Sequence, residues 1–303
     1  MSMQRLYLVD ASVYVFRAYH ALEPNWHDEE GWATHAVHGY ASFLLQLLEQ
    51  LQPSEGMAVC FDEALDSSFR NQIYSPYKAN RDPADEGLLR QFRHCQDFTR
   101  ALGVATLADP IYEADDLIGT LATQARERQV PCVIVSSDKD LTQLIGPGDE
   151  QWDFARDRRW DADGVHERFG VRPEQIADWL ALTGDSVDNI PGIRGIGPTS
   201  ATALLNHFGT LDGLFSRLEE LPFLRLRGAR SLHGKLKGEY ENALLWRQLT
   251  AIATDAPAAL QLPWEGLRPR SPAPAAAGEL CSRLGFGPFM RTRAQKAAEA
   301  CQG

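Results

Sequence analysis

Acidic residues in four short clusters are the residues of this 303-residue chain best suited to chemistry. In the stretch IYEADDLIGT, Glu113, Asp115 and Asp116 fall within four positions and lead directly into an apolar helical pattern. Carboxylates held this close repel one another, and burying even one unpaired ion costs several kcal/mol. We therefore expect a positive group to lie among these side chains.

Together with the other clusters, the candidate metal ligands are Asp10, Asp62, Glu113, Asp115, Asp116, Asp138, Asp140, Asp185 and Asp188. Because no His or Cys accompanies these acids, their oxygen atoms suit hard cations such as Mg²⁺ or Mn²⁺. The surplus of carboxylates fits two ions about 3.5–4 Å apart, a pair that supports in-line displacement at phosphorus. A single aspartate after a strand is more commonly a helix cap or a turn residue, so it is the grouping that favours a metal site.

The formal net charge of −11 argues at first against an anionic partner such as nucleic acid. The nine clustered acids account for most of this charge, so the acidity is local and nucleic acid remains a compatible partner. With 44% hydrophobic residues, a chain of this length can also fill a sizeable core.

The elements that would position these acids follow an alternating pattern. Short apolar runs predict buried parallel strands at residues 6–9, 57–61 and 132–136. Segments with helical periodicity, residues 36–51 and 117–128, separate them. This alternation is typical of an α/β sheet covered by helices on both faces.

Each predicted strand ends in acid. Asp10 follows the first strand, Asp62 the second, and Asp138 and Asp140 the third. In open α/β sheets the ligand crevice lies outside the carboxyl ends of the strands, so these acids are expected to meet at one rim. Glu113 would begin the helix that leads into the third strand, where the helix dipole tolerates acids.

A glycine-rich turn at residues 192–197 precedes a helix with an apolar face at Ala201, Leu204 and Phe208. The glycine order is not that of a dinucleotide-binding fingerprint, and no strand precedes it. Such a turn offers backbone N–H groups to a phosphate, but a plain interhelical turn is an equally good interpretation.

Basic residues gather in two segments. Residues 75–81 (SPYKANR) carry Lys78 and Arg81, and residues 222–238 contain five Lys or Arg residues and no acid. The second segment predicts contacts to a phosphate backbone, whereas the alternative is a solvated surface helix. Tyr74 and Tyr77 could stack on a base or pack in a core.

Other features of the sequence favour a cytoplasmic protein without a disulfide framework or a zinc site. The five cysteines include no Cys-x-x-Cys pair, so packing roles are expected for most of them. His35 and His38 have no metal-binding companions, so a surface or packing role is expected for these histidines. The sequence has no P-loop and no Gly-x-Ser-x-Gly turn, which disfavours nucleotide hydrolysis and acyl transfer. The N-terminus lacks the apolar core of a signal peptide, so we expect a cytoplasmic protein without a membrane partner. Residues 268–278 predict a Pro/Ala-rich linker before a helical tail docked through Phe286 and Phe289.

Five motifs in order resemble those of the bacterial 5′ nuclease family, part of the flap endonuclease superfamily, which includes the N-terminal domain of DNA polymerase I. They are LVDAS with Arg17, FRNQIYSPYKANR, YEADDLIGTLA, SSDKDLTQLI and LTGDSVDNIPGIRGIGPTSA. The resemblance spans roughly residues 5 to 255. It leaves no room for a polymerase or proofreading portion, so a free-standing nuclease is expected.

The resemblance implies a PIN-like parallel-sheet core with a helical arch, followed by a helix-hairpin-helix (helix-three-turn-helix) region that binds duplex DNA. The expected domains are residues 1–170 for the nuclease core, with the arch at about 64–100, residues 171–255 for the DNA-binding region and 256–303 for a linker and tail. In the family a K⁺ ion is often held by carbonyls of the hairpin turn.

Carried over by position, the first metal site would use Asp10, Asp62, Glu113, Asp115 and Asp116, and the second Asp138, Asp140, Asp185 and Asp188. Lys78 and Arg81 would act on the scissile phosphate. The implied DNA-binding residues are Arg17, Arg70, Tyr77, Gly192, Gly195, Gly197, Thr199, Arg225, Arg227 and Lys235. Two positions depart from the family pattern, since Ala11 replaces a glycine and Thr199 replaces a lysine that contacts phosphate.

The sequence thus predicts a Mg²⁺- or Mn²⁺-dependent 5′-3′ exonuclease or 5′-flap endonuclease that uses two ions. Its expected partners are DNA with 5′ ends, flaps or branches and a replication or repair polymerase, and a monomer is expected. Two alternatives are a branched-DNA binding protein with little turnover and a PIN-type ribonuclease. The complete set of acids favours an enzyme, and the YKANR segment with the glycine turn favours DNA.

Overall fold

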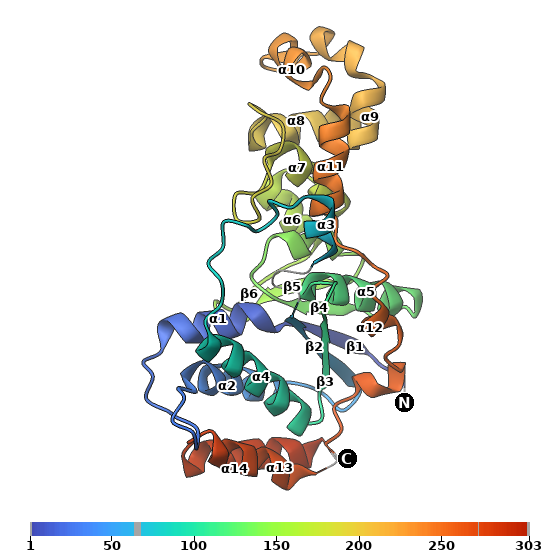
Figure 1. Ribbon diagram of the computed structural model, residues 1–303. Helices are drawn as coiled ribbons and strands as arrows, with labels where there is room; N and C mark the ends of the chain where they lie inside the picture. The colour runs from blue at the N-terminus through green and yellow to red at the C-terminus, as the bar shows by residue number, and fades with distance from the viewer. Residues whose placement is uncertain (1, 64–67, 272, 302–303) are drawn as a thin grey trace.

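The computed structural model describes residues 2–63, 68–271 and 273–301, which form a sheet-based unit and a helical unit (Figure 1). The strands are β1 (Arg5–Asp10), β2 (Glu55–Asp62), β3 (Ala105–Asp109), β4 (Cys132–Val135), β5 (Glu150–Asp153) and β6 (Arg158–Trp160). They form one sheet in the order β3-β2-β1-β4-β5-β6, in which β6 alone pairs antiparallel.

The α-helices are α1 (Ala11–Ala21), α2 (His35–Leu48), α3 (Phe69–Ile73), α4 (Glu86–Ala101), α5 (Ala114–Glu127), α6 (Ala162–Phe169), α7 (Ile176–Thr183), α8 (Pro198–Phe208), α9 (Leu211–Ser216), α10 (Ala229–Leu236), α11 (Tyr240–Thr250), α12 (Pro257–Leu260), α13 (Pro274–Arg283) and α14 (Pro288–Ala300). Short 3-10 helices are η1 (Asp140–Leu144), η2 (Pro173–Gln175), η3 (Leu218–Phe223) and η4 (Trp264–Leu267).

The three predicted strands and both predicted helices of the core are present as β1, β2, β4, α2 and α5. The strands β3, β5 and β6 were not predicted, because they are short and carry polar residues among their apolar ones. They extend the sheet on both sides of the predicted strands, so the acids of β1 and β2 lie near its middle.

The sheet is covered on both faces, as the uninterrupted apolar runs predict. Along β1, Tyr7 and Val9 pack on the face covered by α1, α2 and α4, whereas Leu6 and Leu8 pack on the face covered by α5 and α12. This division follows from the alternation of side chains along a strand. All five cysteines are free, and four of them are buried.

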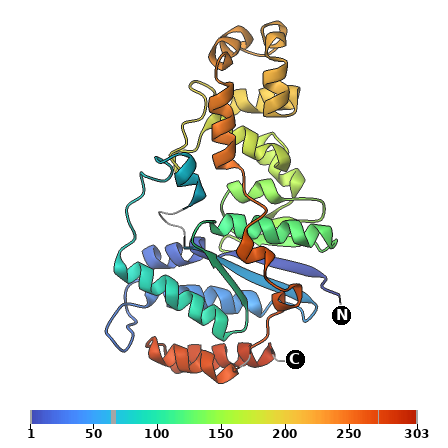
Figure 2. The ribbon, with the colours of Figure 1, turned by 45° about the vertical axis from the view of Figure 1, so that its right-hand side comes forward.

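The helical unit comprises α6 to α11 and has a separate apolar core. Figure 2 shows it extending away from the sheet, with α10 near its far end. The predicted apolar face of α8 is correct, because Ala201, Leu204 and Phe208 are all buried in this core. Tyr77 from the segment before α4 also packs here.

The C-terminal tail forms the hairpin α13–α14, which packs beneath α2 and α4 (Figure 1). The predicted docking through Phe286 is correct, since this side chain is buried, but Phe289 is 81% exposed. The predicted linker at residues 268–278 is partly helical, because α13 begins at Pro274 and proline is tolerated in a first helical turn.

The predicted helical arch is only partly helical. Its residues 64–67 lie outside the described residues. Beyond them, α3 contacts α11, residues 74–85 contain no helix, and α4 packs against α2 through Leu88, Phe92 and Phe98. Among the helices of the described segments, none combines the length and apolar character that a membrane crossing needs.

Candidate active site

The carboxyl ends of the central strands bring predicted ligands together. Asp10 is the last residue of β1 and Asp62 the last of β2. The Ala114 N–H at the start of α5 donates to Asp62 Oδ1 at 2.8 Å, which brings Glu113 and Asp115 to the same rim. After β4, the Ser136 hydroxyl donates to Asp10 Oδ2 at 2.8 Å, and Asp138 follows two residues later.

Four of the nine acids lack a basic partner. In the described part of the chain, no Lys or Arg forms an ion pair with Asp10, Asp62, Asp115 or Asp138. Burial, and then the charge of Asp62, raises the pKa of Asp10 to about 7, although the Ser136 hydrogen bond opposes the shift. Burial, followed by the charges of Asp138, Asp10 and Asp62, raises the pKa of Asp115 well above its ordinary value. The charge of Lys78 opposes the pKa shift of Asp115 only in part. These four acids, the unpaired carboxylates, therefore form one electrostatic group that has no ion-paired cation.

The other five acids have basic partners. Lys78 Nζ lies 2.8 Å from Glu113 Oε1, and Arg81 Nη2 lies 2.7 Å from Asp188 Oδ1. Lys139 forms ion pairs with Asp185 and, at 3.4 Å, with Asp140. Arg70 pairs with Asp116.

The electrostatic grouping differs from the predicted division into two metal sites. Asp138 interacts with Asp10 and Asp115 of the predicted first site, whereas Glu113 and Asp116 are neutralised by basic side chains. In the side-chain positions of the structure, no group of three Asp, Glu, His or Cys residues among those described is arranged to hold a metal ion.

Arg70 and Asp116 form a buried structural pair. Both Arg70 Nη atoms donate to Asp116 at 2.8 Å, and Arg70 also donates to the carbonyls of Leu249 and Ala251 at 2.9 Å. Asp116 further accepts from the Ala253 N–H at 2.8 Å. Arg70 is 3% exposed and Asp116 is fully buried. Neither the predicted DNA contact of Arg70 nor the predicted metal ligation by Asp116 fits these positions, because each is already bonded to the other.

Tyr77 and Lys78 lie against the acids. The Tyr77 hydroxyl is 3.0 Å from Glu113 Oε2 and 3.1 Å from Asp188 Oδ2, and the side chain is 3% exposed. The packing interpretation of Tyr77 is therefore correct, and its ring is not free to stack on a DNA base. Lys78 adopts a left-handed backbone conformation with φ of 54°, and its N–H donates to the Asp188 carbonyl at 3.0 Å.

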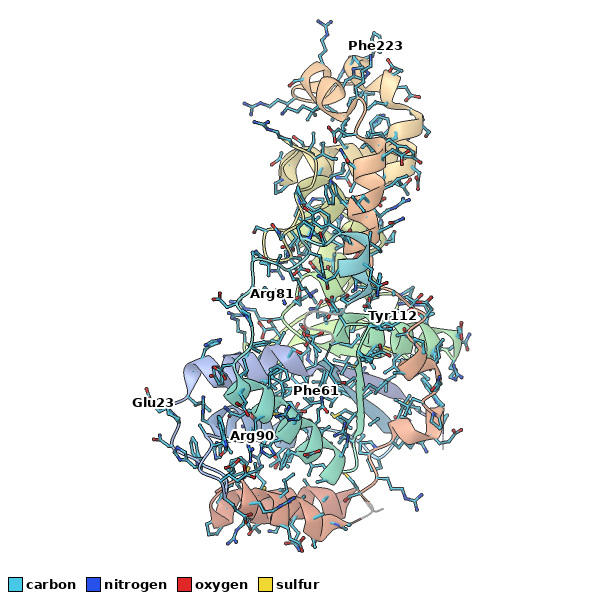
Figure 3. All side chains as sticks on the ribbon, viewed as in Figure 1. Glu23, Phe61, Arg81, Arg90, Tyr112 and Phe223 are labelled. Atoms are coloured by element: carbon cyan, nitrogen blue, oxygen red, sulfur yellow. The ribbon has the colours of Figure 1, made fainter. Side chains whose placement is uncertain are left out.

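Residues 185–190 form a loop that joins the two units at the site. Asp185 and Ile190 exchange two backbone hydrogen bonds, and Asp185 Oδ1 accepts from the Val187 N–H at 2.7 Å. Asn189 Nδ2 donates to the Pro76 carbonyl at 2.7 Å, which ties the loop to the segment that carries Lys78. Figure 3 shows Arg81 in this region between the two units.

The glycine turn has the geometry of a tight interhelical connection. Gly192 has a φ of 64°, and a Cβ there would lie 2.2 Å from the Gly184 nitrogen, so only glycine fits. Gly197 is the N-cap of α8, and with Thr199 it is exposed. The Gly195 carbonyl accepts from Lys235 Nζ at 2.8 Å. Because the Lys235 ammonium already occupies this oxygen, the Gly195 carbonyl is not free to bind the expected potassium ion.

The remaining predicted DNA contacts lie on the surface. Arg17 is exposed on α1, and Arg225 and Arg227 are exposed in the connection before α10. Beside them Phe223 is 87% exposed and lies at the far end of the helical unit (Figure 3). Arg225 and Arg227 therefore lie apart from the carboxylate rim, whereas Arg17 lies on the helix that begins directly after Asp10.

Comparison with known families identifies the fold and its order of units. Residues 5–170 match the family described as 5′-3′ exonuclease, N-terminal resolvase-like domain, and residues 171–274 match its C-terminal SAM fold. The chain belongs to the 5′-3′ exonuclease family. The predicted α/β core followed by a helical unit is thus confirmed as the fold of this family, and the sheet is mixed rather than wholly parallel.

The curated relatives of this 5′-3′ exonuclease family member include long DNA polymerases and a shorter flap endonuclease. The chain is 40% identical over 301 residues to DNA polymerase I of Pseudomonas aeruginosa, covering 99% of this chain and 32% of that protein. It spans about a third or less of the length of these polymerase relatives. It is 37% identical over 221 residues to flap endonuclease Xni of Pectobacterium carotovorum, covering 73% of this chain and 80% of the relative.

Solved structures share the fold of this 5′-3′ exonuclease family member at low identity. The T5 5′-exonuclease with bound divalent zinc ions superposes with a TM-score of 0.66 and 18% identity over 98% of this chain and 99% of that chain. The catalytic core of Rad2 in complex with DNA substrate gives a TM-score of 0.62 and 14% identity over 99% and 92%.

Sequence reasoning missed two residues of the site. Ser136 orients Asp10, and Lys139 neutralises Asp140 and Asp185. Both lie in the quoted motif SSDKDLTQLI. A lysine between two predicted ligands was a usable signal, because an ammonium beside carboxylates is expected to pair with one of them.

Proposed function

We propose that this chain is a divalent-metal-dependent 5′-3′ deoxyribonuclease that hydrolyses DNA phosphodiesters near 5′ ends and flaps. The observation that carries this proposal is the group of unpaired carboxylates at the strand ends of a 5′-3′ exonuclease fold. Burial of like charges without counter-charge is unfavourable, so the group is suited to a cation. The names of its relatives, DNA polymerase I and flap endonuclease, support DNA as the substrate and a role in replication or repair.

The donor set fits Mg²⁺ or Mn²⁺, because it consists of carboxylate oxygens without His or Cys. Asp10, Asp62, Asp115 and Asp138 would hold one ion, and Asp140, Asp185 and Asp188 would hold a second after their basic partners move. When bound, such ions supply an activated water and stabilise charge on the phosphate oxygens. The zinc ions in the T5 5′-exonuclease structure agree with divalent-metal binding in this fold.

The basic residues of this chain would bind and orient the DNA. Lys78 and Arg81 lie beside the carboxylates, paired with Glu113 and Asp188, and would contact the scissile phosphate when metal ions occupy the neighbouring carboxylates. The exposed N-terminus of α8 offers N–H groups to a duplex phosphate. Arg17, Arg225 and Arg227 would hold the backbone farther away. We further propose that the protein acts as a monomer on DNA in the cytoplasm.

A labelled 5′-flap tests the proposal. We expect cleavage with Mg²⁺ or Mn²⁺ and none with excess chelator. Asp115→Asn should lower the single-turnover rate at least about a hundredfold, because it removes a ligand from the unpaired carboxylates. Asp163→Asn on α6 is the matched control, since Asp163 is exposed and outside the site.

Three outcomes would each contradict a part of this proposal. Undiminished cleavage in chelator would exclude the metal mechanism. Tight flap binding without turnover under any metal would instead indicate a branched-DNA binding protein, and preferential cleavage of single-stranded RNA would indicate a PIN-type ribonuclease.

A further inference from the structure

Counter-charge is divided unequally between the two halves of the acid cluster. Asp10, Asp62, Asp115 and Asp138 have no Lys or Arg partner in the described part of the chain. The other half, Asp140, Asp185 and Asp188, has two cations. Lys139 pairs with Asp140 and Asp185, and Arg81, whose side chain is 46% exposed, pairs with Asp188. The inference that we draw from this inequality concerns how metal ions bind the site, and this inference rests on the proposed function.

Lys139 is held in position over both of its partners. Its Nζ forms ion pairs with Asp185 and with Asp140 Oδ1, the latter at 3.4 Å. Asp185 comes from the loop between α7 and α8, so this contact crosses from the sheet unit to the helical unit. The Lys139 carbonyl accepts from the Thr142 N–H at 3.1 Å, which fixes the backbone at the start of η1.

Burial favours a positive charge beside both Asp185 and Asp140. The Asp185 side chain is 4% exposed, so its charge is poorly screened by water. Asp140 Oδ1 is buried and accepts no hydrogen bond among the described residues. A lysine ammonium is a mobile point charge on a four-carbon stem, and the Lys139 side chain is about a third exposed, so it can swing outward.

We propose that Lys139 is a built-in counter-cation for this half of the site, and that a second divalent ion binds Asp140 and Asp185 only by displacing its ammonium. No Lys or Arg of the described residues forms an ion pair with the unpaired carboxylates, and the charges of Lys78 and Lys139 reach Asp115 and Asp138 only from beyond ion-pair distance. The protein should therefore bind one divalent ion tightly and a second one more weakly, with Lys139 setting the difference. In the metal-free protein the same ammonium stabilises the fold by neutralising buried charge.

Binding of Mn²⁺ without DNA tests this proposal, measured by calorimetry with wild type, Lys139→Gln and Lys139→Arg. The glutamine retains an N–H donor but removes the charge, whereas the arginine retains the charge. We expect Lys139→Gln to tighten the weaker site at least about tenfold, because it removes the ammonium that is ion-paired with Asp140 and Asp185. The tighter site should change much less, because Lys139 acts on Asp138 only from beyond ion-pair distance. Lys139→Arg should keep the weak second site.

Lys296→Gln controls for net charge, because it removes the exposed positive charge of Lys296 on α14, a helix away from the carboxylate rim (Figure 1). This control should bind both ions as the wild type does. The metal-free melting temperature supplies a second readout, in which Lys139→Gln should melt lower than wild type and gain more from Mn²⁺. If Lys139→Gln unfolds without metal, refolding by Mn²⁺ supports the exchange of ammonium for metal, and failure to refold overturns it.

Unchanged affinity of the weaker site in a folded Lys139→Gln overturns the proposal, as does an equal shift at both sites. Its failure is distinguishable from failure of the proposed function. Wild type that binds two Mn²⁺ ions equally and cleaves the flap refutes only the role of Lys139. Wild type that binds no Mn²⁺ refutes both.

Discussion

At the scale of single residues, ion pairing separates acids that look equivalent in the sequence. Asp115 and Asp116 are neighbours, yet Asp115 belongs to the unpaired carboxylates and Asp116 accepts two hydrogen bonds from buried Arg70. The difference arises because successive side chains of a helix point in different directions. Asp116 faces α3 and the end of α11, and Asp115 faces the strand ends.

Arg70 is therefore expected to matter for stability. Arg70→Met leaves Asp116 as an uncompensated buried charge, which should lower the free energy of unfolding by about 3–5 kcal/mol. Urea unfolding measures this loss. The double variant with Asp116→Asn should lose less than the two single variants combined, because the pair is then removed together. A folded Arg70→Met with near wild-type stability and weakened DNA binding would instead support the original prediction of a DNA contact.

At the scale of elements, the C-terminal hairpin α13–α14 completes the core beneath α2. The His38 ring on α2 stacks on Trp26 with centroids 3.9 Å apart and meets the edge of Phe286 at 5.1 Å. The packing role predicted for this histidine is thus correct. Burial lowers the pKa of His38 below its ordinary value, since the charged ring is disfavoured among apolar groups.

This contact predicts a dependence of stability on pH. A lowered folded-state pKa means that the unfolded chain binds the proton more readily, so stability is complete above about pH 6.5 and falls as the pH drops below it. Urea midpoints at about pH 7.5 and about pH 5.5 measure the loss. His38→Phe retains a ring and should show a smaller loss than wild type. Equal losses in both proteins would assign the effect to other groups.

At the scale of the whole molecule, the fold separates the acids from the surface cations. The carboxylates line the sheet rim, while Arg225 and Arg227 lie in the outer part of the helical unit beside exposed Phe223 (Figure 3). A chain with a net charge of −11 thus carries exposed arginines away from its acidic rim, where the proposed function places a DNA backbone.

We expect the double variant Arg225→Gln, Arg227→Gln to weaken duplex binding and to flatten its log–log salt dependence by about 2 units, because each lost phosphate contact removes about 0.9. Turnover at saturating DNA should persist, since neither residue is near the carboxylates. The variant Arg283→Gln, Arg291→Gln on the tail hairpin is the control for charge. Unchanged affinity and slope in the first variant would mean that this surface is only solvated.

The sequence by itself determined the sheet core, the buried strands and the acids that follow them. Apolar runs and strand ends are local features, and the carboxyl ends of parallel strands share one rim wherever the chain forms such a sheet. The order of the motifs likewise sufficed to indicate the family, which the comparisons confirm.

The tertiary structure alone decided which acids remain unpaired. Arg70 lies 46 positions from Asp116, Lys139 lies 46 positions from Asp185, and Arg81 lies 107 positions from Asp188. Arg70 and Asp116 meet only when the sheet-based unit folds, and the other two pairs form only when the two units pack together. No periodicity or spacing encodes these contacts. Burial then sets the charge balance, because a carboxylate excluded from water depends on whichever cation the fold brings within a few ångströms.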